Sequence, residues 1–342
     1  MEAGGWPDLL RADPLDWLLD ETNPAIRYLG LRDILDLPEN DQEVRTAKRR
    51  IMEEGGDVSR ILARQKPGGF WETEEDFYVR AKYRGTVWQL IILAEMGADG
   101  SDPRIQRSCQ FILDWSQDRE SGGFAYQGSR SSGGVHSGVM PCLTGNMVWS
   151  LIRLGWGEDP RVEEGIRWLA EFQRTDDGET EPPASWPYTR FESCWGRHTC
   201  TPGLVKALKA LGEIPADKQT PEANELISRG TEFLLKHHLF KRSHDLDRVA
   251  KPQWTRFGFP TMWGTDALEM VRVLLKLGIR DGRMQEAVDL IVSKQDEQGR
   301  WNLENTYNGR FHFNIERKGH PSRWITLHAL QTLKGFREEV LL

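Results

Sequence analysis

Cysteine and histidine side chains near the middle of this 342-residue chain have the types and spacing of a metal site. Cys194 and His198 are four residues apart, His198 and Cys200 are two apart, and Cys142 lies on an earlier segment. Thiolate and imidazole are the ligands that zinc prefers, and a structural site uses four of them in a tetrahedron. These four residues therefore predict a zinc site, for which His136 is a spare ligand. The alternative interpretation is that the cysteines are small buried residues and His198 a hydrogen-bonded polar one.

Asp266 is an isolated acid that stands directly before an apolar helical segment, in Trp263-Gly264-Thr265-Asp266-Ala267. An aspartate at this position can act as a general acid, although most acids at a helix start are caps or partners of the helix dipole. Two basic stretches, 236–256 and 310–323, also precede helical segments. They predict an anion-binding rim, and the alternative is a solvated surface whose charges pair with nearby acids.

A repeat sets the positions of these residues. Apolar helical segments end in glycines spaced 58, 57 and 66 residues apart, at Gly97, Gly155, Gly212 and Gly278. A glycine just past a periodic segment is a helix stop, and an aspartate that follows can cap a second helix. Such aspartates stand at 102, 159 and 281. Each unit therefore predicts an almost wholly apolar inner helix followed by an amphipathic outer helix.

Six inner helices are expected, near residues 25–36, 83–96, 141–154, 199–211, 261–277 and 322–334. The last of them has no outer helix after it. A short helix over residues 6–19 can take that place and close a ring between the chain ends. The sequence thus predicts one all-α domain over residues 1–342, an α/α toroid around a central cavity.

Glutamine-led turns end the outer helices, and two of them fit Gln-x-x-x-Gly-x-Trp, at 65–71 and 295–301. Degenerate copies start at Gln117 and Gln173. With the helix pairs and the count of six units, these turns resemble the terpenoid cyclase and protein prenyltransferase superfamily across almost the whole chain. The resemblance implies an α/α toroid, and an unrelated helical stack of HEAT type is the alternative fold.

The resemblance also implies where chemistry takes place, at the starts of the inner helices. Protein prenyltransferases hold zinc there with Asp-x-Cys and a histidine, whereas this chain has His198-x-Cys200 and no matching histidine. The cyclases use an aspartate of an Asp-x-Asp-Asp motif as the acid. This chain has no such motif, and Asp266 is the residue nearest to it. Both departures leave the reaction open. The residues expected to bind substrate at this end are Tyr83, Arg84, Trp195, Arg197, Arg256, Trp263, Arg323 and Trp324.

We therefore expect an enzyme that acts on an apolar substrate, such as an isoprenoid, with an anionic head in the central cavity and zinc bound nearby. One alternative is a non-catalytic ligand-binding or scaffold toroid with structural zinc. Another is a polysaccharide-processing toroid enzyme, which needs a pair of facing carboxylates. A prenyltransferase would also need a helical-repeat partner subunit, which one sequence does not identify.

Composition narrows the remaining classes. Apolar residues at 38% and charged residues at 28% describe a globular chain, and a net charge of −7 disfavours a nucleic-acid surface. No apolar stretch approaches the ~20 residues of a membrane span. Because the first residues lack a basic start and an apolar core, we expect a cytoplasmic protein whose four cysteines form no disulfide scaffold.

Overall fold

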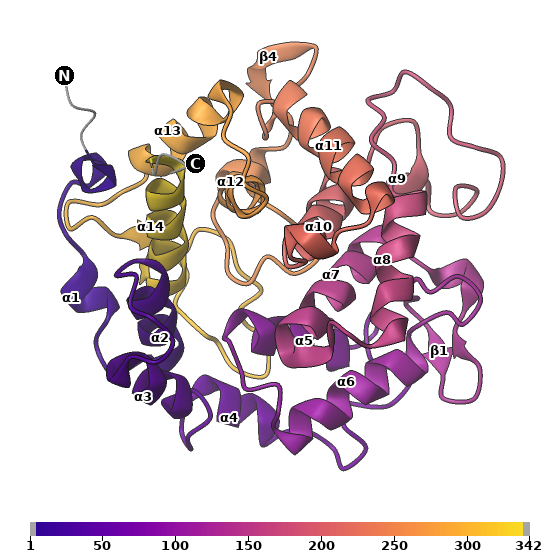
Figure 1. Cartoon of the computed structure of the whole chain (residues 1–342), viewed down its shortest axis with the longest axis horizontal. Coiled ribbons are helices and arrows are strands. Elements are labelled where there is room, and N and C mark those ends of the chain that lie inside the picture. Colours follow the sequence, from indigo (N-terminus) through magenta and orange to yellow (C-terminus); the bar gives the residue numbers. More distant parts are fainter. Residues whose placement is uncertain (1–4, 338–342) are drawn as a thin grey trace.

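The computed structural model describes residues 5–337, so the ends of the predicted 1–342 domain lie outside the described residues. Over this range the chain is an all-α toroid with helices α1 to α14 and six short strands. Figure 1 looks down the ring and shows one set of helices around its centre and a second set outside. The inner helices are α2 (Pro24–Asp33), α5 (Thr86–Glu95), α7 (Pro141–Leu151), α10 (Thr201–Leu211), α12 (Ala267–Lys276) and α14 (Arg323–Arg337).

The outer helices follow their inner partners along the chain. They are α3 (Gln42–Arg50), α4 (Asp57–Leu62), α6 (Pro103–Trp115), α8 (Pro160–Phe172), α11 (Pro221–Lys236) and α13 (Gln285–Ser293). Asp102 and Asp159 cap α6 and α8 through the amides of Arg104 and Arg161, as the sequence predicts. No helix in the described part of the chain is long and apolar enough to cross a membrane.

Three antiparallel pairs of short strands lie in the connections between helices. They are β1 (Gly128–Ser129) with β2 (Gly133–Gly134), β3 (Lys241–Arg242) with β4 (Asp245–Val249), and β5 (Trp301–Asn302) with β6 (Pro321–Ser322). The segment between β5 and β6 runs across the ring toward α5 (Figure 1), where the amide of Tyr83 donates to the carbonyl of Arg310.

The glutamine-led turns fasten each outer helix to its neighbours. Gln65 donates to the carbonyl of Arg104 on the next outer helix at 2.8 Å, and the indole of Trp71 donates to Ile61 on α4 at 2.9 Å. The last copy repeats this pattern, because Trp301 is fully buried and donates to Ile291 on α13 at 2.7 Å. A Cβ on Gly299 would lie 2.0 Å from the carbonyl oxygen of residue 12, so this turn requires glycine.

The N-terminal segment lies beside α14 and meets the last of these turns. Gln295 donates to the carbonyl of Leu9 at 2.9 Å and accepts from the amide of Arg11 at 3.0 Å. The segment is not the single helix predicted over 6–19, but a short 3₁₀ turn (Trp6–Leu9) followed by α1 (Leu15–Leu18). Pro14 explains the break, since proline has no N–H and disfavours helix at the residue before it.

One further expectation about a helix end is corrected. The inner helix predicted over 261–277 begins only at Ala267, because Asp266 is its N-cap and the preceding residues form a turn. Gly97, Gly155 and Gly278 have the positive φ angles of helix stops, and Gly212 is the C-cap of α10 with a φ of −67°.

Candidate functional site

The predicted zinc ligands are only partly brought together. Cys142 lies in the first turn of α7 and Cys200 is the N-cap of α10, while Cys194 lies on the short helix α9 (Glu192–Trp195). The thiols of Cys194 and Cys200 are hydrogen-bonded, and this bond helps to lower the pKa of Cys200 to about 6. Burial instead raises the pKa of Cys142 to about 12. Three thiols therefore lie close to one another at the starts of two adjacent inner helices.

His198 does not complete this cluster. Its side chain is 73% exposed, and its Nδ1 atom lies 3.9 Å from Asp177 Oδ1. The spare candidate His136 is bound to Asp118 at 2.7 Å. Within residues 5–337, no group of three or more histidine, cysteine or acidic side chains is arranged to hold a metal ion. The residues as placed do not fit the four-ligand site, and zinc binding stays a prediction from the sequence.

Asp266 caps the inner helix α12 from a buried position. Its two carboxylate oxygens accept from the amides of Gly258 and Glu269, both at 2.9 Å, and only 4% of the residue is exposed. Burial raises its pKa from 3.8 to about 7, and the charge of Glu269 acts in the same direction. Asp266 therefore holds a proton for a substantial part of the time at neutral pH.

A recess of about 260 Å³ opens beside Asp266 at the N-terminal end of the inner ring. Its walls include the rings of Trp254, Trp263 and Tyr307, and Lys251 lies at its edge. The Lys251 ammonium lies 5.4 Å from the ring centre of Trp254 and forms no ion pair with any described residue. The recess thus combines aromatic faces, one free cation and one protonatable acid.

Tyr83 supports the wall of this recess from behind. Its hydroxyl accepts a 2.9 Å hydrogen bond from the indole of Trp263, 180 residues along the chain, and its ring lies 4.0 Å from that of Tyr307. Tyr83 is buried, and Trp263 is partly open to solvent. The structure therefore brings together Tyr83, Trp263 and Asp266 from the set of predicted site residues. Tyr307 and Trp254 complete the wall, but neither residue belongs to a repeat motif in the sequence.

The other predicted substrate-binding residues lie elsewhere. Arg84 and Arg256 are exposed, Arg197 pairs with Glu181 at 3.1 Å, and Arg323 pairs with Asp20. Trp195 and Trp324 are buried packing residues, and Trp324 stacks on Phe259 with ring centres 4.2 Å apart.

The basic stretch 236–256 also pairs with acids. Lys236 contacts Asp177 and Glu179, while His238 and Lys241 contact Glu286. These pairs correspond to the solvated surface that the sequence offered as the alternative to a rim.

A buried ion pair lies directly behind Asp266. Lys206 is 1% exposed, and its ammonium contacts both oxygens of Glu269 at 2.6 and 2.7 Å. The hydroxyl of Thr261 donates to the same carboxylate at 2.8 Å. Lys209, one turn further along α10, contacts Glu269 at 3.4 Å and also pairs with Glu95. Sequence reasoning missed this network, and its signal was the presence of lysines and glutamates within the inner helices.

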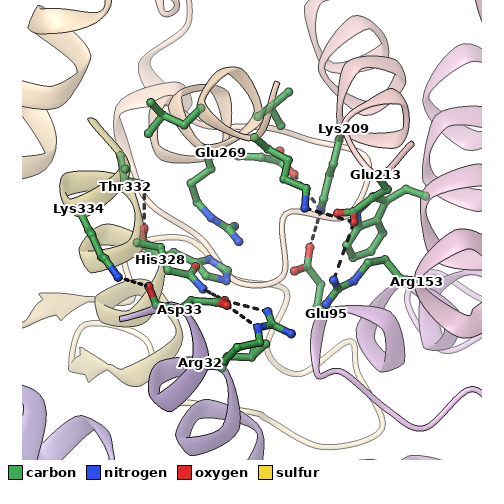
Figure 2. A pocket seen from close by; sticks show the side chains of 18 of the residues that line it. Arg32, Asp33, Glu95, Arg153, Lys209, Glu213, Glu269, His328, Thr332 and Lys334 are labelled. Atoms are coloured by element: carbon green, nitrogen blue, oxygen red, sulfur yellow. Dashed lines mark hydrogen bonds and ion pairs between the residues drawn. The ribbon is translucent and has the colours of Figure 1, made fainter. Parts of the chain in front are cut away.

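A second cavity, of about 400 Å³, lies toward the C-terminal ends of the inner helices. Figure 2 shows Arg32, Glu95, Lys209 and His328 reaching into it from four different helices. The sequence located function only at the opposite, N-terminal end. The charged lining of this cavity contrasts with the aromatic wall beside Asp266.

Comparison with known proteins finds no matching family model and no matching curated protein. Solved structures with a similar fold include a variant of the type II terpene cyclase MstE from Scytonema in complex with geranylgeranyl dihydroxybenzoate. That structure is 16% identical, with a TM-score of 0.45 over 93% of this chain and 88% of its own. A protein from Actinoplanes is 15% identical, with a TM-score of 0.45 over 94% and 96% of the two chains. The unliganded MstE structure is 15% identical, with a TM-score of 0.42 over 92% and 87%.

Proposed function

We propose that the chain is a terpenoid cyclase-like enzyme in which Asp266 donates a proton to a short unsaturated substrate bound in the aromatic recess. The observation that carries the proposal is a buried carboxyl group, with its pKa raised to about 7, at the inner end of an aromatic cavity. A general acid is most effective when its pKa lies near the working pH.

The proposed reaction begins with the transfer of a proton from Asp266 to the substrate. The Asp266 proton adds to one carbon of a substrate double bond, whose electron pair forms the new C–H bond. The neighbouring carbon becomes a cation. A second double bond can attack this cation, which forms a carbon–carbon bond and moves the positive charge to another carbon. In either case the final cation loses a proton to water or to the Asp266 carboxylate. The faces of Trp254, Trp263 and Tyr307 can stabilise this cation, because aromatic faces attract positive charge.

The recess also limits the substrate. Its volume of about 260 Å³ lies just below the ~300 Å³ at which typical ligand pockets begin, which favours a short isoprenoid over a long one. Lys251 at the edge forms no ion pair with a described residue, so it is the group we assign to an anionic head.

The experiment compares wild-type protein with Asp266→Asn on geranyl and farnesyl alcohols and diphosphates, with products detected by mass spectrometry. Asparagine is also a good N-cap, so the helix start is preserved while the proton is removed. We expect product formation to fall by about 10² or more, the range attributed to general acids. Asp102→Asn, which changes the cap of the outer helix α6, serves as the matched control and keeps full activity.

Circular dichroism establishes that both variants are folded. Absence of product from wild-type protein across the panel would contradict the proposal. Equal activity in Asp266→Asn and Asp102→Asn would contradict it as well.

A further inference from the structure

The 400 Å³ cavity carries one positive charge more than its own acids balance. Six basic and five acidic side chains line it. Every one of the five carboxylates contacts a basic side chain: Asp33 with Arg32, Asp36 with Lys334, Glu95 with Lys209, Glu213 with Arg153 and Lys276, and Glu269 with Lys206 and Lys209. The guanidinium of Arg272 has no such contact.

Arg272 projects from α12 into the cavity and forms no hydrogen bond or ion pair with any residue in the described range 5–337. It is only partly exposed, and its charge lowers the pKa values of Glu95 and His328. A guanidinium that makes no hydrogen bond with the protein is free to form paired hydrogen bonds with a bound anion. Basic residues often balance the negative ends of helices, but the basic residue in the last turn of α12 is Lys276.

His328 adds a second group without a partner. It is buried against the rings of Phe259 and Trp324, and its ring nitrogens make no hydrogen bond with a described residue. Burial lowers its pKa well below the ordinary value, and Arg272 and Lys209 act in the same direction. The imidazole is therefore neutral near pH 7 and offers one N–H donor and one acceptor.

We infer that the cavity binds a small oxyanion. Its carboxylate or phosphate group would form paired hydrogen bonds with the guanidinium of Arg272 and accept the N–H of His328. Asp266 is not among the residues that line this cavity, and the inference does not depend on the function proposed for the Asp266 recess.

Isothermal titration calorimetry with malate and with inorganic phosphate tests the inference. We expect wild-type protein to bind one of these anions, and Arg272→Gln to bind it at least about tenfold more weakly. Arg229→Gln is the matched control, because it removes the same charge from an exposed position on the outer helix α11 that is paired with Glu225 and does not line the cavity. Its affinity is expected to stay within about twofold of wild type, the size of a screened surface effect.

Arg272→Lys distinguishes paired hydrogen bonding from charge alone, and it should bind more weakly than wild type but more tightly than Arg272→Gln. The thermal midpoint of each variant establishes that it is folded. No binding of either anion to wild-type protein at millimolar concentration would overturn the inference. Equal losses in Arg272→Gln and Arg229→Gln would also overturn it, since general charge would then account for binding.

Discussion

Because folding favours the protonated form of Asp266, the free energy of unfolding depends on pH. The substitution Asp266→Asn removes this dependence and so allows it to be measured. Its pKa is 3.8 when exposed and about 7 when folded, so the folded protein favours the protonated form. The favourable contribution of that proton is fully present below pH 3.8 and is lost as pH rises through about 7. At 1.36 kcal/mol per pKa unit, the full change is roughly 4 kcal/mol. The Asp266→Asn variant has no titratable group at position 266, so its free energy of unfolding lacks this pH-dependent contribution.

The assay is urea unfolding followed by circular dichroism from pH 4.5 to 8. We expect the difference in free energy of unfolding, wild type minus Asp266→Asn, to fall by about 3 kcal/mol over this range, because part of the full change lies below pH 4.5. Asp102→Asn is the control, because hydrogen bonding to Arg104 lowers the pKa of Asp102. The contribution of the Asp102 carboxylate to stability is present above pH 3.8 and is lost only at lower pH. The difference in free energy of unfolding between wild type and Asp102→Asn should therefore not change between pH 4.5 and 8. A flat difference for Asp266→Asn too would refute the reasoning.

Two further predictions concern the packing that supports the site. Lys206→Met leaves Glu269 buried without its closest cation and should cost about 3–5 kcal/mol in urea unfolding, while Lys206→Met with Glu269→Leu recovers most of the loss. Trp301→Ala removes a fully buried ring and its bond to Ile291, and should cost about 3–5 kcal/mol, against much less for the partly exposed Trp263→Ala. A stable Lys206→Met, or equal losses in the two tryptophan variants, would contradict these predictions.

The toroid follows from local patterns that a single sequence displays. Aspartate caps, glycine stops and glutamine-led turns each act within a few residues, and each recurs in several of the units. Closure of the ring was predicted from the unit count, and the contacts of Gln295 with residues 9 and 11 lie at that point. Pro14 was a readable signal against the single helix over 6–19.

The site was predicted only where chemistry coincides with a repeat position. Asp266, Trp263 and Tyr83 stand at inner-helix starts, which the repeat locates. His198 also stands at such a start, but its side chain points into solvent, and side-chain direction in a turn is not encoded by spacing. The Lys206–Glu269 pair joins residues 63 positions apart on two different inner helices. No local pattern could have indicated that their charged residues face each other.

The central claim is that a proton passes from Asp266 to substrate carbon, and turnover in D₂O tests it most directly. A substrate that wild-type protein converts is incubated in D₂O, and the product is examined by mass spectrometry and NMR. We predict one deuterium bound to carbon in the product, and no product with Asp266→Asn. Product that carries no deuterium on carbon, or labelled product at the same rate from Asp266→Asn, would contradict the account.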